Sequence, residues 1–179
     1  MLLVVGAMAI LSTLTMSINT TILQAYVVSY DSEATIDAMS FGQAMIDEIQ
    51  TQAFDSVTTT TQVVKTPALC TPPSRLGADI DSEKAVTAFG RVDSFPYLSQ
   101  VDFNDVDDYN HYSRLVKSTH LGNFIVRDSV FYVQEASLDV PASTQTWYKK
   151  ILVTISHPNL FRPVVMKSIV VFRRYIPPS

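Results

Sequence analysis

Residues 1–30 read MLLVVGAMAILSTLTMSINTTILQAYVVSY and contain no charged side chain, so the first charged side chain is Asp31. An α-helix rises about 1.5 Å per residue, and thirty residues would extend for roughly 45 Å, more than the ~30 Å hydrocarbon core of a bilayer requires. A continuous apolar surface of this size is rarely left in water. The sequence therefore predicts that this segment lies in lipid or packs against other copies of the chain.

The segment differs from a secretory signal peptide in charge and in length. A signal peptide begins with a positive region and has an apolar core of about 7–15 residues, whereas the first basic residue here is Lys65. A segment that inserts into a membrane usually has flanking positive charges that set its orientation. We therefore expect that a basic leader has been removed and that Met1 lies near a mature N-terminus.

Residues 31–54 have the periodicity of an amphipathic helix, because apolar side chains recur every three or four residues between polar and acidic ones. The apolar stripe consists of Ala34, Ala38, Phe41, Met45, Ile49 and Ala53, and Ile46 widens it. No proline occurs before Pro67, so residues 1–54 can form one helix of roughly 80 Å. Its first half would project, and its second half would dock onto a domain.

Hydroxyl and amide side chains crowd residues 12–21 of this predicted helix. Such side chains compete for backbone hydrogen bonds and lower helix propensity. Two outcomes are open. Either the helix bends or melts at residues 12–21, or the hydroxyls bond to the carbonyls of the preceding turn and the helix runs straight.

The middle of the chain, residues 55–113, is rich in Thr, Ser and Pro, and the adjacent Pro72 and Pro73 interrupt any regular element. We expect a loop-rich region there, with short strands at Thr61–Val64 and Val86–Phe89.

Residues 101–113, VDFNDVDDYNHYS, form an acidic segment with aromatic residues. Calcium takes six to eight oxygen ligands, and this density of oxygen-bearing side chains fits that requirement. The spacing is not that of an EF-hand, and Asp and Asn also close turns and cap helices without any metal. Calcium and a metal-free turn both remain open, and no other cofactor is indicated. The calcium candidates are Asp102, Asn104, Asp105, Asp107 and Asp108.

The last region, residues 114–179, is rich in Val, Ile, Phe and Tyr. Its three apolar segments begin at residues 124, 148 and 164: FIVRDSVFYVQ, YKKILVTIS and VVMKSIVVFRRY. Turn-rich stretches separate them, so they predict an antiparallel meander. The apolar face of such a sheet needs a cover, and the stripe of the amphipathic helix can supply it. The predicted fold class is therefore α+β.

This layout resembles that of type IV pilins and of the pseudopilins of type II secretion. Three local segments are similar to parts of those families: ATIDAMSFGQAMIDEIQTQAFDSV to the end of the helix, FNDVDDYNHYS to an Asp-rich segment before the sheet, and YKKILVTISHP to the penultimate strand. The chain departs from the pattern in two places. The glutamate that pilins usually carry near the start of the helix is replaced by Val5, and the helix-breaking proline is missing.

The resemblance implies a structural subunit that polymerises into a helical filament of identical copies at the cell surface. Before assembly, the subunit would sit in the inner membrane, where a prepilin peptidase and an assembly machinery would act on it. The missing glutamate removes the usual register device, but buried charge pairs are often replaceable by apolar packing, so assembly is still expected. The residues expected to pack between copies are Leu2, Leu3, Val4, Val5, Met8, Ile10, Leu11, Leu14, Ile18, Ile22 and Leu23.

Two alternatives remain: a pseudopilin of a secretion system, and a binding domain anchored in a membrane by a single helix. Enzymatic motifs are absent from the sequence, which has only five glycines and no nucleotide-binding or hydrolase signature. Residues 1–108 carry 14 acidic and 4 basic residues, and residues 109–179 carry 3 and 9. This asymmetry allows acidic and basic parts of neighbouring copies to face each other. The net charge of −4 argues against nucleic-acid binding.

Overall fold

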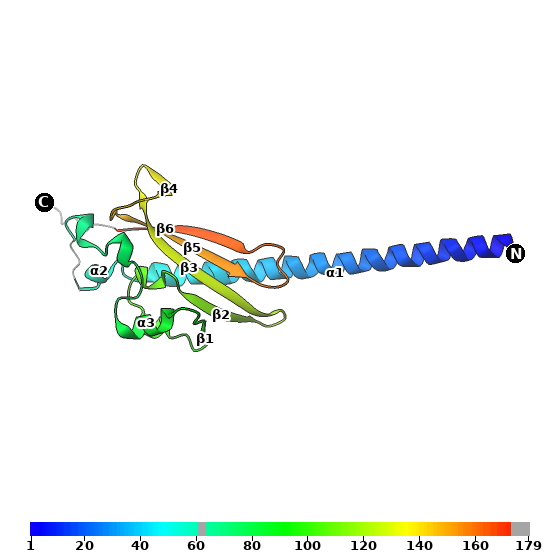
Figure 1. The fold of residues 1–179 in the computed structure, drawn as a ribbon, viewed down its shortest axis with the longest axis horizontal. Coiled ribbons are helices and arrows are strands. Elements are labelled where there is room, and N and C mark those ends of the chain that lie inside the picture. Colours follow the sequence, from blue (N-terminus) through cyan, green and yellow to red (C-terminus); the bar gives the residue numbers. More distant parts are fainter. Residues whose placement is uncertain (61–63, 173–179) are drawn as a thin grey trace.

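The computed structural model of the protein describes residues 1–60 and 64–172. Its longest element is α1 (Leu2–Thr51), a single helix of 50 residues. The N-terminal half of α1 projects away from a domain that is built on its C-terminal half (Figure 1). The predicted α+β fold class, a long N-terminal helix packed by its second half on an antiparallel sheet, is confirmed.

The polar stretch at residues 12–21 does not interrupt the helix. The Ser12 Oγ donates to the carbonyl oxygen of Met8 at 2.8 Å, and the Thr15 Oγ1 donates to that of Leu11 at 2.7 Å. Thr13, Thr20 and Thr21 bond to the preceding turn in the same way. Of the two outcomes left open by the sequence, the structure therefore has the straight helix.

The domain contains a six-stranded sheet in the order β1-β2-β3-β5-β6, with β4 paired to β3 off this path. The strands are β1 (Asp93–Ser94), β2 (Ser113–Ser118), β3 (Gly122–Gln134), β4 (Ser137–Pro141), β5 (Tyr148–Ser156) and β6 (Val164–Val171). The short β1 is parallel to β2, and all other pairs are antiparallel. The predicted three-stranded meander corresponds to β3, β5 and β6, and it is confirmed.

The stripe of the amphipathic helix lies on β5 and β6, as expected. Ala34, Ala38, Met45 and Ile49 on α1 are fully buried, together with inward-facing residues of the sheet. Gly42 packs tightly against the sheet, because a Cβ there would be 2.5 Å from the Sδ of Met166. A larger residue at this position would therefore force the helix and the sheet to shift.

The helix ends at Thr51, before the predicted boundary at residue 54. Ala53, which we expected to continue the stripe, instead forms a bridge with Asp105. The amide of Val106 donates to the carbonyl oxygen of Ala53 at 2.9 Å. The acidic segment therefore captures the backbone that would have formed another helical turn.

The region 55–113 contains more helix than its composition suggested. It includes α2 (Ser56–Thr60), α3 (Asp81–Thr87) and α4 (Ser99–Asp102). The strand predicted at Val86–Phe89 is wrong, because Val86 and Thr87 lie in the last turn of α3. Glu83 closes the start of that helix by accepting hydrogen bonds from the amides of Asp79 and Ile80, both at 3.0 Å. The strand predicted at Thr61–Val64 falls mostly on residues 61–63, outside the described residues.

Candidate functional site

The projecting half of α1 presents an unusual amount of apolar surface. Within residues 1–30, every residue whose burial is described is exposed. The predicted packing residues range in exposed fraction from 48% at Ile22 to 90% at Leu3. Leu2 is the one member of the predicted set whose side chain lies outside the description. The other predicted residues therefore form one continuous exposed surface.

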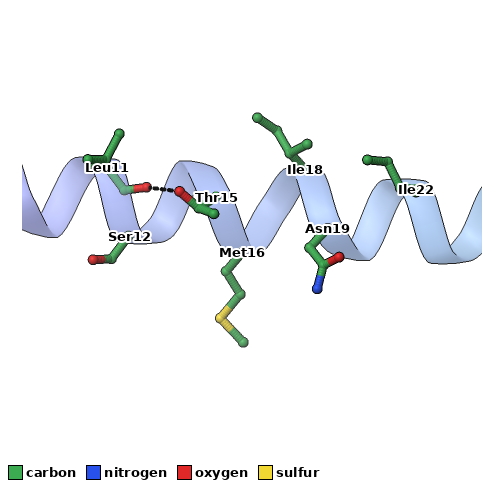
Figure 2. A pocket seen from close by; sticks show the side chains of 7 residues that line it. All are labelled: Leu11, Ser12, Thr15, Met16, Ile18, Asn19 and Ile22. Carbon is green, nitrogen blue, oxygen red and sulfur yellow. Dashed lines mark hydrogen bonds between the residues drawn. The ribbon is translucent and has the colours of Figure 1, made fainter.

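Apolar groups occur on more than one side of this helix. Figure 2 shows Leu11, Ile18 and Ile22 on one side and Met16 on the opposite side, next to Ser12 and Asn19. Thr15 turns its hydroxyl back to the carbonyl of Leu11, which gives the hydroxyl a partner within the helix. A helix that is apolar around its circumference is stable when lipid or protein surrounds it on all sides.

By length and composition, α1 is able to cross a membrane. None of its most apolar stretch is buried in the domain. The segment is thus long and apolar enough to act as a membrane anchor, a criterion that a signal sequence also meets.

The described apolar surface extends further than the predicted set. Tyr26, Val27, Val28 and Tyr30 are all more than half exposed. Phe161, in the loop between β5 and β6, is 71% exposed, and its amide donates to the Asp31 Oδ1 at 3.0 Å. Sequence reasoning missed Phe161 because it is 130 residues from its partner on the helix.

A buried ion cluster fixes the chain just after the docked half of the helix. Lys149 on β5 is completely buried, and its Nζ donates to the Asp107 Oδ1 at 2.6 Å and to the Asp55 Oδ2 at 3.0 Å. It also donates to the carbonyl oxygen of Phe54 at 2.6 Å. The cluster therefore joins the chain just after α1, the acidic segment and a central strand.

A second ion pair links the helix to the sheet. The Arg114 Nη1 on β2 donates to the Glu48 Oε2 at 2.7 Å, and the Tyr109 hydroxyl donates to the Glu48 Oε1 at 3.2 Å. Asp128 on β3 is buried, and neither of its carboxylate oxygens has a partner among the described residues. Burial raises the pKa of Asp128 well above its usual range, which favours the neutral form.

The acidic segment is folded as a turn closed by its own side chains. The Asp105 Oδ1 accepts from the amide of Asp107 at 2.8 Å. The Asp108 Oδ2 accepts from the amides of Asn104 at 2.9 Å and Asp105 at 3.1 Å. Burial raises the pKa of Asp105 to about 10 and that of Asp108 to about 7. The turn thus keeps carboxyl groups where their charged forms are disfavoured.

The side chains of the five calcium candidates have different partners. Asp107 binds Lys149, Asp102 lies half-exposed at the end of α4, and the Asn104 side chain donates to Glu83 at 2.9 Å. Among the described residues, the acidic group with ligand atoms within 4.8 Å of one another is Asp79, Glu83 and Asp108. Backbone amides already donate hydrogen bonds to the carboxylates of Glu83 and Asp108. These hydrogen bonds explain why the trio lies together, because they close the loop before α3.

No family model matches this chain, and neither the curated proteins nor the solved structures that were searched gave a match. The feature of the structure that bears on function is the contrast between the exposed and the docked halves of α1.

Proposed function

We propose that this protein is a structural subunit of a type IV pilus-like filament and polymerises through residues 1–30. The observation that supports the proposal is a projecting half-helix that exposes apolar side chains on several sides and carries no charged side chain. In a filament, such half-helices bundle in the core, and the folded domains cover the outside.

The packing of these half-helices against one another supplies the driving force for filament assembly. Burial of apolar surface contributes about 25 cal/mol per Å², so a few large side chains per subunit contribute several kcal/mol before the cost of ordering. Gly6 and Ala7 allow close approach of neighbouring helices, because small residues let backbones come together. Nothing lies within 4 Å of the position that a Cβ of Gly6 would occupy.

The ion pairs of Lys149 and Arg114 couple the helix to the folded domain. Arg114 pairs with Glu48 on α1, and Lys149 pairs with Asp55 just after the helix and with Asp107. In this proposal, these pairs transmit a pull on the projecting half to the folded domain. A filament subunit needs this coupling, since neighbouring subunits contact the helix while the domain carries the outer surface.

In this proposal, the same surface faces lipid before assembly. The subunit waits in the inner membrane, where a prepilin peptidase and an assembly machinery act on it, and it is then extracted into the filament. A pseudopilin would use the same helix in a short filament, and an anchored binding domain would keep the helix in lipid permanently.

The decisive experiment is the substitution Leu14→Asp. A carboxylate in the middle of the apolar surface must be desolvated in a filament core, and this cost should abolish assembly. The readout is negative-stain electron microscopy of filaments sheared from the source cells, with mass spectrometry of the fibres. The matched control is Leu138→Asp on β4, where an exposed leucine lies away from the projecting helix.

We expect filaments from the control and none from Leu14→Asp, with the unfolding transition of the domain unchanged in both. Normal filaments from Leu14→Asp would contradict the proposal. If the unmodified chain stays in the membrane fraction without sheared fibres, the pseudopilin or the anchored domain replaces the pilus subunit.

A further inference from the structure

Three aromatic rings lie at the point where α1 leaves the domain. We call this set the collar: Tyr26 and Tyr30 on the helix, and Phe161 in the β5–β6 loop. The three residues are 60%, 52% and 71% exposed, respectively. The loop between β5 and β6 points along the helix toward the N-terminus (Figure 1). The collar thus lies at the edge of the domain that faces the projecting segment.

The position of Phe161 is set by contacts on both sides of the loop. Its amide donates to the Asp31 Oδ1 at 3.0 Å, and it lines a shallow hollow with Val27 and Tyr30. At the start of the loop, His157 stacks on Phe124 with ring centroids 4.2 Å apart, and its Nε2 contacts the carbonyl oxygen of Leu121 at 2.9 Å. These contacts hold the loop on the helix while Phe161 remains exposed.

The spacing along the helix places the collar at a defined height. About twenty residues of helix span the ~30 Å hydrocarbon core, and the chain offers an uncharged segment of this length before Tyr26. Tyr26 and Tyr30 then fall in the interfacial layer, where aromatic side chains are enriched at membrane surfaces. Asp31 follows immediately, outside the hydrocarbon.

We infer that the collar seats the domain on the lipid headgroup layer while the subunit is in the membrane, with the Phe161 ring inserted into the interface. This inference depends on the membrane stage of the proposed function. Lipid fits better than a second folded domain because Tyr26 and Tyr30 continue the uncharged segment of the helix without a break. Arg162 follows Phe161 and is exposed, and a cationic side chain at this position favours anionic lipid phosphate.

The test uses tryptophan fluorescence of the full-length protein in phosphatidylcholine vesicles that contain lipids brominated near the headgroup. The native Trp147 is first replaced by Phe, and single tryptophans are then introduced as Phe161→Trp, Leu14→Trp and Phe89→Trp. Leu14→Trp reports insertion of the helix, with quenching read from lipids brominated deeper in the acyl chain. Phe89→Trp reports an exposed ring in the turn after α3.

We expect the Phe161→Trp and Leu14→Trp variants to lose emission on contact with their brominated lipids and the Phe89→Trp variant to keep it, at every protein-to-lipid ratio. If Leu14→Trp is quenched and Phe161→Trp is not, the collar inference is overturned and the membrane stage stands. If neither variant is quenched, the membrane stage itself is wrong. Emission from the Phe161→Trp variant that shifts with protein density and not with bromination would assign the collar to a second copy and would also overturn the inference.

Discussion

The two halves of α1 have the same backbone structure and opposite surroundings. Up to residue 30, every side chain whose burial is described is exposed, whereas between residues 34 and 49 the helix buries Ala34, Ala38, Met45 and Ile49 completely. The helix continues through both halves without a break. The contrast teaches that secondary structure does not decide what a helix contacts. The distribution of apolar side chains around its axis decides whether it packs on its own domain or on something outside it.

The largest expected effect concerns the ion cluster that follows the docked half. Lys149→Met should lower the free energy of unfolding of the domain by about 3–5 kcal/mol, because it leaves Asp55 and Asp107 buried without their cation. Urea denaturation followed by circular dichroism would measure the loss. The control is Lys167→Met on β6, where the lysine is exposed and no comparable loss is expected. A loss below about 1 kcal/mol for Lys149→Met would show that the cluster does not hold the domain together.

A matched pair of isoleucines compares the two halves directly. Ile49→Ala should cost about 2–5 kcal/mol of unfolding free energy, because it creates a cavity in the core of the docked half. Ile18→Ala removes the same atoms from the projecting half, where the side chain is 52% exposed, and should leave the unfolding transition unchanged. Filament yield should respond in the opposite order and fall more for Ile18→Ala than for Ile49→Ala. Equal effects of the two substitutions on unfolding would contradict the distinction between a docked half and an exposed half of α1.

The smallest effect concerns the pH dependence of the acidic turn. Burial raises the pKa of Asp108 from 3.8 to about 7, so the folded protein binds this proton more tightly than the unfolded chain does. The contribution of Asp108 to the free energy of unfolding is therefore fully present below the pKa that this carboxyl has in the unfolded chain. It is lost as the pH rises from about 4 to 7. Asp108→Asn should flatten this part of the pH profile of unfolding, whereas Asp102→Asn, at a half-exposed position, should not. If the free energy of unfolding of Asp108→Asn changed with pH as it does in the unmodified protein, the raised pKa of Asp108 would be contradicted. The projecting half contains no charged side chain and should contribute nothing to the profile.

Several features could be predicted from local pattern. The uncharged run predicts the projecting half, the three-and-four spacing predicts the docked half, and the strand-like segments predict the meander of β3, β5 and β6. These features depend on periodicity over a few neighbouring residues, which the sequence displays directly. The errors occurred where local signals compete. Val86–Phe89 has strand-like residues, but Glu83 caps a helix that includes Val86 and Thr87, and Ala53 leaves the helix because the acidic segment binds its backbone.

By itself, the sequence determined the fold class and the apolar character of residues 1–30, because composition and spacing alone decide which surfaces avoid water. Only the tertiary structure decided which acids meet which bases. Lys149 joins Asp55 and Asp107 across 94 and 42 residues of chain, and Phe161 meets Asp31 across 130. The same distinction applies to the acidic segment, in which Asp105, Asp107 and Asp108 look equivalent in sequence. One contacts a buried lysine and the others accept amide hydrogen bonds, because each side chain acquires its partner only when distant segments are brought together.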